Sequence, residues 1–361
     1  MSAYYVGLMS GNSLDAMDAV LVRFTAQSYE VLAEYKVPIP TAFRTAVQSF
    51  SLSHSTDRFF TLDSELAELA IAAVKGVLSQ AQLSSSRVTA IGLHGQTLCH
   101  FPDNKPWTIQ VGNPHHVAAA TGIDVIADFR RRDIIEGGQG APLAPLLHQF
   151  ALASADRPRY IVNIGGIANV SALAAGGDFV AGFDTGPGNI LLDSYMQQTQ
   201  QQPYDASGAF AASGTLNTAA LVAMLDDPFF QLPPPKSTGR EQFNLAWASS
   251  FFTPDSAPAD IMQTLTHLSA RSIAEAIQRC PEAGDIYLCG GGAYNDHLRA
   301  LISTYIGQPI DTTAALGMEP HVVEAVTFAY LAYLHHQGKR VCMRAITGAK
   351  RPYRLGVYCP A

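Results

Sequence analysis

One carboxylate beside a glycine-rich segment is the part of this chain best suited to chemistry. Asp184 follows the apolar run 179–183, which predicts a strand, and precedes the small residues 185–189, which predict a turn. Ile190 and the leucines after it predict the first turn of a helix. Because backbone N–H groups at the start of a helix attract phosphate, Asp184 is predicted to be a general base held beside a phosphate.

Two further segments place glycine and polar residues at strand ends. The apolar runs 4–9 and 19–22 flank the polar residues 11–15, which predicts a β-hairpin with a phosphate-sized tip. A third apolar run, 286–289, leads into the three glycines 290–292. Backbone without Cβ atoms would let a flat ring or a ribose approach these glycines closely.

Each of these segments is also compatible with an ordinary turn that binds nothing. In that alternative Asp184 caps the helix after it, and the glycines serve only to tighten the chain. All three motifs fall at strand ends of one chain, which favours a phosphate site over three unrelated turns.

Alternation of extended and helical segments predicts an α/β protein. Apolar residues recur at helical spacing over 64–79, and a second helix is expected over 113–122, with proline in its first turn and glycine at its end. Strands are expected over 29–36, 88–93, 107–111 and 123–127.

The same order of elements starts again near residue 160. The runs 160–164 and 167–171 flank Gly165 and Gly166, which predicts a second hairpin, and the strand leading to Asp184 follows. Two successive units indicate a duplicated α/β domain with a cleft between the copies. The late helices, about 261–279 and 321–337, are expected to cover the second sheet.

Length, composition and charge exclude several classes of protein. A chain of 361 residues exceeds the size of one growing core, so two domains are expected. The net charge of −7 argues against nucleic acid as a partner, and no apolar stretch reaches the roughly 18 residues of a membrane span. The N-terminus lacks the basic region of a signal peptide, and the five cysteines show no paired spacing, so a reducing, cytoplasmic location is expected.

Three consecutive arginines, 130–132, are the local exception to the acidic charge. They cannot all face one way on a strand or a helix, so at most one or two of them reach a site. At least one is expected to form an ion pair with Asp128 or Asp133.

In this order the motifs resemble the superfamily of sugar kinases, actin and heat-shock ATPases, and more narrowly the anhydro-N-acetylmuramic acid kinase family. The resemblance implies duplicated actin-like ATPase (ribonuclease H-like) domains with an active-site cleft between them. Domain I is expected over 1–127 plus about 345–361, and domain II over 128–344. The matching segments are 7–15, 94–97, 128–133, 137–143, 163–166, 182–189, 236–241, 289–292, Glu324 and 355–360.

The resemblance implies a kinase that also cleaves a sugar bridge. The family takes 1,6-anhydro-N-acetylmuramic acid, ATP and water, and gives N-acetylmuramic acid 6-phosphate and ADP in recycling of cell-wall peptidoglycan. The carboxylate that matches Asp184 activates water for attack at the anomeric carbon. Glycoside cleavage normally also uses an acid, but the γ-phosphoryl group can capture the leaving O6 instead. ATP and Mg²⁺ are the implied cofactors, and a homodimer is expected.

The match also assigns binding residues. Arg132, Glu324 and Thr97 line the sugar site with Gln96 nearby, and a guanidinium suits the sugar's lactyl carboxylate. From its residue type alone Glu324 reads as a surface helix residue. Asp15 is the implied partner of Mg²⁺ through water. The implied ATP contacts are Gly11, Asn12, Ser13, Leu14, Asp15, Ala16, Met17 and Asp18 in the first hairpin, Gly165, Gly166, Gly186, Gly188 and Asn189 opposite them, and Gly290, Gly291 and Gly292 at the nucleoside.

The chain departs from the family pattern at Asn12 and Ala16, where threonine and glycine are usual. A Cβ at Ala16 adds strain if this position has a positive φ. Two other functions stay open: an ordinary sugar kinase that acts on a free hydroxyl, and a nucleotide-binding regulator that phosphorylates no sugar.

Overall fold

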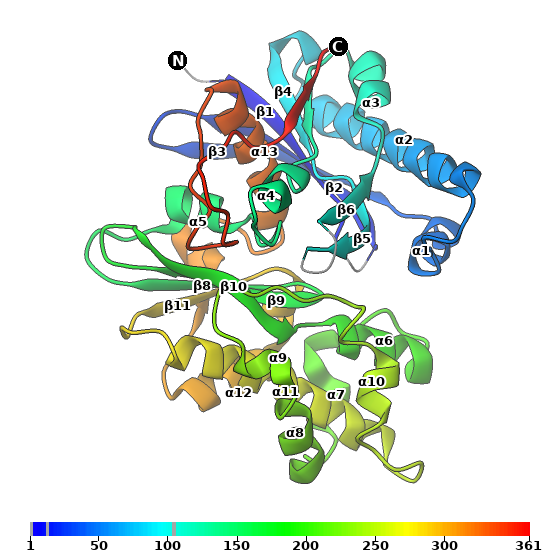
Figure 1. Cartoon of the computed structure of the whole chain (residues 1–361), viewed down its shortest axis with the longest axis vertical. Coiled ribbons are helices and arrows are strands. Elements are labelled where there is room, and N and C mark those ends of the chain that lie inside the picture. The colour runs from blue at the N-terminus through cyan, green and yellow to red at the C-terminus, as the bar shows by residue number, and fades with distance from the viewer. Residues whose placement is uncertain (1–2, 12–13, 103–105) are drawn as a thin grey trace. The chain divides into compact units, whose positions relative to one another are not determined.

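The computed structural model describes residues 3–11, 14–102 and 106–361. It divides into two compact units (Figure 1). The first unit is formed by residues 1–147 and 322–361, and the second by residues 148–321.

The first unit is built on a six-stranded mixed sheet (Figure 1). The predicted N-terminal hairpin continues into a third antiparallel strand, and the later strands add in parallel beside the first strand. The C-terminal strand pairs antiparallel at the edge. The order is β13-β7-β4-β1-β2-β3, with β1 (Ala3–Met9), β2 (Ala16–Phe24), β3 (Tyr29–Pro38), β4 (Val88–Leu93), β7 (Val125–Ala127) and β13 (Val357–Cys359).

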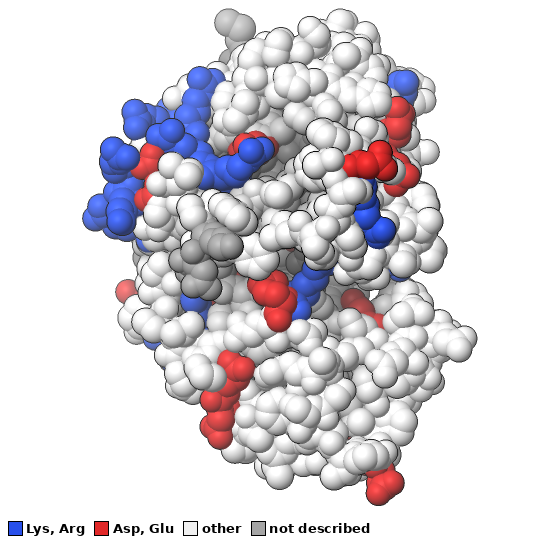
Figure 2. Space-filling model, turned by 45° about the vertical axis from the view of Figure 1, so that its right-hand side comes forward, with Lys and Arg blue, Asp and Glu red and all other residues white. Residues whose placement is uncertain are grey.

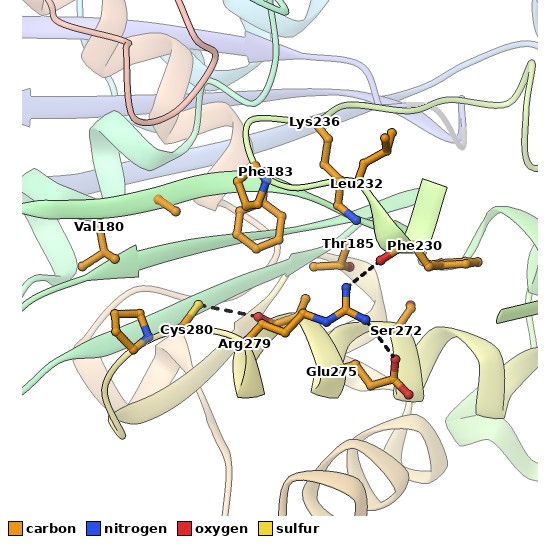
Figure 3. Close-up of a pocket in the computed structure, with 14 residues that line it drawn as sticks. Val180, Phe183, Thr185, Phe230, Leu232, Lys236, Ser272, Glu275, Arg279 and Cys280 are labelled. Carbon is orange, nitrogen blue, oxygen red and sulfur yellow. Dashed lines mark hydrogen bonds and ion pairs between the residues drawn. The ribbon is translucent and has the colours of Figure 1, made fainter. Parts of the chain in front are cut away.

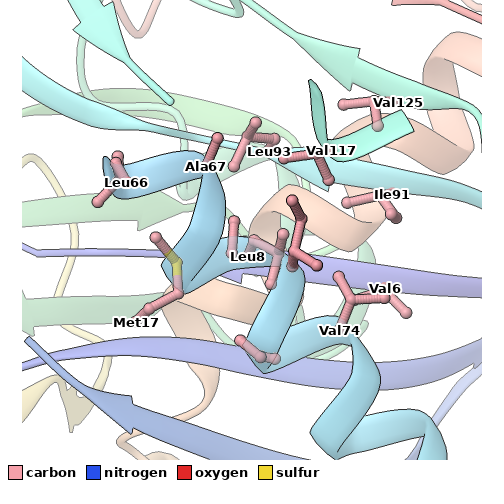
Figure 4. Packing of buried hydrophobic residues seen from close by; sticks show 14 of the residues in the cluster. Val6, Leu8, Met17, Leu66, Ala67, Val74, Ile91, Leu93, Val117 and Val125 are labelled. Atoms are coloured by element: carbon pink, nitrogen blue, oxygen red, sulfur yellow. The ribbon is translucent and has the colours of Figure 1, made fainter. Parts of the chain in front are cut away.

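Helix α2 (Thr56–Gln80) covers one face of this sheet. Alternate residues of β1, Val6 and Leu8, pack with Val74 of the helix in one buried cluster (Figure 4). The helix begins earlier than the sequence pattern predicts because Ser55 caps it, its side chain accepting a backbone N–H of the first turn.

Helix α13 (Val323–His336) packs against β1 and β4, where strand glycines allow close approach. A Cβ on Gly7 would lie 1.9 Å from the carbonyl oxygen of Ala325, and one on Gly92 would lie 1.9 Å from that of Phe328. The expectation that this helix covers the second sheet was therefore wrong. Along the chain, the boundaries between the compact units fall at 147/148 and 321/322, whereas the sequence predicted them at 127/128 and 344/345.

The second unit repeats the same arrangement of strands. Three antiparallel strands form a meander, and two more follow in parallel beside the first of them. Helix α11 (Pro258–Gln278) packs on this sheet, as predicted. The duplicated α/β architecture is thus confirmed. The order is β10-β9-β8-β11-β12, with β8 (Arg159–Ile164), β9 (Ile167–Leu173), β10 (Phe179–Pro187), β11 (Asp285–Cys289) and β12 (Asp311–Thr312).

Shorter elements complete the two units. In the first unit these are α1 (Thr41–Gln48), β5 (Gln96–Phe101), β6 (Trp107–Val111), α3 (Pro114–Thr121) and α4 (Arg131–Ile135), and α5 (Pro145–Leu152) leads into the second. The second unit adds α6 (Ile190–Gln200), α7 (Ala209–Ala212), α8 (Thr218–Leu225), α9 (Pro228–Gln231), α10 (Leu245–Ser249) and α12 (Asp296–Ile306). Within the described residues, no helix combines the length and apolar character needed to cross a membrane.

Candidate active site

Asp184 lies inside strand β10 and not at its end. The strand continues through Pro187, which pairs with Ile167 of β9, so the turn predicted at 185–187 was wrong. Asp184 does not cap helix α6 either, because the residue at the N-cap is Asn189. Pairing with β9 outweighs the turn preference of the glycine and proline in this segment.

The segment 236–238 fixes the buried carboxylate of Asp184. The backbone N–H of Asp184 donates to the carbonyl oxygen of Lys236 over 3.0 Å, and the N–H of Thr238 donates to Oδ2 of Asp184 over 3.0 Å. Only 5 % of Asp184 is exposed. A buried carboxylate needs such donors, and this one is thereby held in one orientation.

Side chains on both sides of this segment hold it in place. The hydroxyl of Thr238 donates to Oε1 of Gln242 over 2.9 Å, and Nε2 of Gln242 donates to Asp227 over 3.1 Å. Lys236 Nζ donates to the carbonyl oxygen of Phe229 over 2.9 Å and lies 4.4 Å from the centre of its ring. Sequence reasoning matched this segment to the family but did not predict its contacts with Asp184. Its lysine directly after three prolines was the available signal.

Burial, together with the nearby charge of Arg279, lowers the pKa of Lys236 to about 8, and the carboxylate of Asp184 opposes this shift. Lys236 is 7 % exposed, so its ammonium is largely removed from water.

Two segments of the second unit that were predicted to contact phosphate, 165–166 and 188–189, lie together and are joined by backbone hydrogen bonds. The N–H of Gly188 donates to the carbonyl oxygen of Gly166 over 2.9 Å, and that of Asn189 donates to Gly165 over 2.8 Å. The N–H of Ile190 also donates to Gly166, over 3.0 Å. These three N–H groups at the start of α6 are already paired, so phosphate binding here would use other groups.

The three consecutive glycines after β11 differ in what surrounds them. A Cβ on Gly290 would lie 2.5 Å from Oδ1 of Asn163, and one on Gly292 would lie 2.3 Å from the side chain of Ile164. A Cβ on Gly291 would meet no atom nearer than 3.8 Å. The protein's own packing therefore requires glycine at 290 and 292, and only Gly291 offers open space.

In the first unit, Gln96 and Thr97 lie side by side on β5. The hydroxyl of Ser10 donates to Oε1 of the buried Gln96, and Nε2 of Gln110 donates to Thr97 over 3.2 Å. Glu324 lies in the first turn of α13 and is half-buried. It is therefore more enclosed than the surface position that its residue type suggests.

Arg132 is held by an unpredicted carboxylate. It forms an ion pair with Glu136, whose side chain is 3 % exposed, and Arg351 Nε lies 3.0 Å from the other oxygen of Glu136. Hydrogen bonds and charge from the two guanidinium groups lower the pKa of Glu136, against the opposing effect of burial. The guanidinium of Arg132 is thus fixed while 56 % of its side chain stays exposed.

The other arginines of the run bond within the first unit. Arg130 donates to Nε2 of the buried His94 over 2.8 Å and to the carbonyl oxygen of Gly140 over 2.8 Å. Burial and the charge of Arg130 hold the pKa of His94 well below its usual value. Arg131 pairs with Asp128 at 2.9 Å, which confirms the expected ion pair.

Asp133 is a buried anchor and not an arginine partner. It accepts the N–H of Gly140 over 2.6 Å, the hydroxyl of Thr347 over 2.7 Å and the hydroxyl of Tyr353. These bonds tie the glycine loop after α4 to the C-terminal segment, which is why residues 128–147 belong to the first unit.

The surface of the first unit carries a concentration of positive charge. Residues 339–354 include exposed lysines and arginines at 339, 340, 344, 350, 351 and 354 and no Asp or Glu. Figure 2 shows Lys and Arg side chains gathered in one region of the surface. Such a region attracts small anionic ligands even though the whole chain is acidic.

Part of the first hairpin tip lies outside the described residues, including the predicted contacts Asn12 and Ser13. Leu14 has a φ of 55°, and its N–H donates to Gly11 over 3.1 Å. Asp15 exposes 58 % of its side chain and lies 3.1 Å from Arg44. Within the described part of the chain, no group of three metal-ligating side chains occurs.

The second half of the predicted loop is strand and not tip. Ala16 is the first residue of β2 and pairs with Pro38, and it is not among the residues with positive φ. The strain expected at Ala16 is therefore absent. Met17 is fully buried, and Asp18 lies 3.4 Å from Lys36.

Comparison with solved structures supports the fold. The activator of the 2-hydroxyisocaproyl-CoA dehydratase from Clostridium difficile with bound ADPNP superposes with a TM-score of 0.50 and 11 % identity, covering 93 % of this chain and 96 % of that one. At this identity the similarity concerns the fold alone, which is the duplicated actin-like α/β fold expected from the sequence.

Comparison with known sequences identifies the family. The model of the family described as anhydro-N-acetylmuramic acid kinase matches residues 3–361. The protein of that name from Shewanella pealeana is 45 % identical over 364 residues, which cover 99 % of each chain. Its counterpart from Shewanella baltica is 44 % identical over 362 residues, covering 98 % of each. The chain therefore belongs to the anhydro-N-acetylmuramic acid kinase family.

Proposed function

We propose that this kinase hydrolyses the 1,6-anhydro bridge of 1,6-anhydro-N-acetylmuramic acid and transfers the γ-phosphoryl group of ATP to O6. Membership of the family supports the substrate and the kinase activity. The observation that carries the mechanism is the buried carboxylate of Asp184, held through Oδ2 by the N–H of Thr238.

Asp184 acts as the general base in this proposal. A carboxylate fixed in one orientation deprotonates a water molecule as the water attacks the anomeric carbon. The bond from the anomeric carbon to O6 breaks, and O6 forms a bond to the γ-phosphorus. The bond from that phosphorus to the oxygen that bridges it to the β-phosphate breaks, and ADP leaves with the electron pair. The remaining catalysis is positioning and neutralisation of the phosphate charge.

The sugar binds through residues of the first unit. Arg132 offers a fixed and partly exposed guanidinium to the lactyl carboxylate, which suits its fork of donors. Thr97, Gln96 and Glu324 supply hydrogen bonds to the ring substituents. Support for Arg132 comes from its ion pair with Glu136, which fixes the guanidinium before substrate arrives.

ATP and Mg²⁺ complete the proposal. The hairpin tip at 11–15 and the glycines Gly165 and Gly166 contact the phosphates, and the open backbone at Gly291 accepts the nucleoside. Asp15 fits Mg²⁺, which typically takes one or two carboxylates and otherwise phosphates and water. Bound Mg²⁺ supplies neutralisation of phosphate charge. The cytoplasmic location and the homodimer stay predictions.

The test is mass spectrometry of the sugar after incubation with ATP and Mg²⁺. The proposal expects the mass of the anhydro sugar to rise by one phosphoryl group (HPO₃) plus one water. In ¹⁸O-labelled water the label is expected on the anomeric oxygen and absent from the phosphate. Phosphorylation without added water, or turnover only with the open sugar, would instead support an ordinary sugar kinase.

A further inference from the structure

A pocket of about 140 Å³ lies in the second unit beside β10 (Figure 3). Successive strand residues point to opposite faces, and Phe183 and Thr185 line the pocket while Asp184 does not. The other walls come from the segment 230–236 and from α11 with the residues that follow it. The pocket is therefore separate from the face that carries the proposed base.

Most of the pocket wall is apolar. Phe183, Phe230 and Leu232 present side chains to it, and Ala276 forms part of the floor. An apolar cavity of about this volume binds molecules the size of benzene, which sets the scale of the apolar body that this partly open pocket accepts. The shape and lining thus suit a compact apolar body.

Two cations interrupt the apolar wall. Lys236 and Arg279 both line the pocket (Figure 3). They are close enough to each other that the charge of Arg279 lowers the pKa of Lys236. Within the described residues, Lys236 has no carboxylate at ion-pair distance, and its ammonium bonds instead to a backbone carbonyl. A buried cation beside a second cation is costly unless an anion joins them.

The single carboxylate of the pocket is already shared. Glu275 accepts from Nε of Arg271 over 2.8 Å, and its other oxygen lies 3.7 Å from Arg279. Arg279 also donates to the carbonyl oxygen of Phe230 over 2.6 Å. Among the lining residues two cations thus face one carboxylate, and the carboxylate of Asp184 acts on Lys236 from outside the pocket.

We propose that this pocket binds a small apolar monocarboxylate. The apolar body packs against Phe183, Phe230 and Leu232, and the carboxylate lies between Lys236 and Arg279. The volume limits the ligand to about six to nine non-hydrogen atoms, given that a cavity of roughly 150 Å³ accepts benzene.

Calorimetric titration with benzoate, without sugar or nucleotide, tests the proposal. Wild-type protein should bind one benzoate with a Kd below about 1 mM, as a well-fitting ligand of this size allows. Benzamide, which has the same shape without the charge, should bind at least tenfold more weakly. Absence of saturable binding, or equal affinity for benzamide, would overturn the proposal.

Two variants locate the binding. Lys236→Met removes the cation, and Ala276→Leu fills the pocket while keeping Lys236, so the second remains informative if the first fails to fold. Each should weaken benzoate binding at least tenfold. Ala300→Leu, the same enlargement at an exposed position of α12, should leave the affinity unchanged. Benzoate binding that survives Ala276→Leu would place the site elsewhere and refute the assignment. Because no substrate is present, this outcome is independent of the proposed reaction.

Discussion

The two sheets share one strand order but differ at the end of the third strand. β3 and β10 are each the third strand of an antiparallel meander, and each lies at the edge of its sheet. Residues 36–38 at the end of β3 are exposed or half-buried, whereas residues 184–187 at the end of β10 are all buried. The third strand of the first unit therefore ends in solvent, whereas the last four residues of the third strand of the second unit, of which Asp184 is the first, are enclosed.

The difference comes from what covers each strand end. In the second unit the segment 236–238, which lies between α6 and α11, donates to and accepts from Asp184. In the first unit, α1 and α2 occupy the corresponding interval between the third and fourth strands. A duplicated fold can supply two similar strands, but a buried carboxylate also needs donors, and here the inserted segment provides them.

The largest expected effect is loss of turnover in Asp184→Asn. If the enclosed strand end carries the general base, kcat should fall by about 10² or more, since general base catalysis is typically worth that much. ATP binding and the fold should be retained. Asp178→Asn, the same change at an exposed position just before β10, serves as the control. Near-normal turnover of Asp184→Asn would remove the functional contrast between the strand ends.

A second prediction separates packing glycines from a ligand-facing glycine in the second unit. Gly292→Ala should lower the free energy of unfolding by about 2–3 kcal/mol, because its Cβ would overlap Ile164. Gly291→Ala meets open space and should leave stability nearly unchanged while raising the KM for ATP. Urea unfolding and steady-state kinetics measure the two effects. A normal KM in Gly291→Ala would argue that the nucleoside lies elsewhere.

Buried histidines make both units sensitive to acid in the same direction. Burial holds the pKa of His94 in the first unit well below its usual value, and lowers that of His148 in the second to about 3. The unfolded chain takes up protons near pH 6.5 while these folded histidines do not, so stability falls as the pH drops from 6.5 toward 3.

His148→Gln tests this contribution in the second unit alone. Its loss of unfolding free energy between pH 7 and pH 5 should be smaller than that of wild type by about 2 kcal/mol. Denaturant titrations at the two pH values give this difference. The exposed His54→Gln should follow wild type at both. An unchanged pH dependence in His148→Gln would mean that His148 is protonated in the folded protein.

Local patterns in the sequence were sufficient for most strands of both sheets, but not for the short edge strands β12 and β13. The hairpin at Gly165 and Gly166 and the helix ending at Gly122 were predicted from alternation and turn residues, and the structure has both. These features depend on neighbours in the chain, which is why a sequence pattern reveals them.

Features that depend on distant partners were not predictable in this way. The apolar spacing of α13 shows that the helix is buried but not which sheet it covers, and the glycines at 7 and 92 that receive it lie far away in the chain. Glu136 holds Arg132 together with Arg351, again from a remote segment. β10 extends through Pro187 because β9 pairs with it, against the local preference for a turn.

The smallest predicted effect concerns the start of β2, beside the hairpin tip of the first unit. Ala16 pairs with Pro38 in ordinary strand geometry, so glycine has no strain to relieve there. Ala16→Gly should lower the free energy of unfolding by about 0.5–1 kcal/mol, the usual cost of glycine within a strand, and leave the KM for ATP unchanged. Urea unfolding and ATP titrations measure both quantities. A more stable variant, or one with a lower KM for ATP, would show that the first hairpin is strained at its tip, unlike the tight glycine hairpin of the second unit.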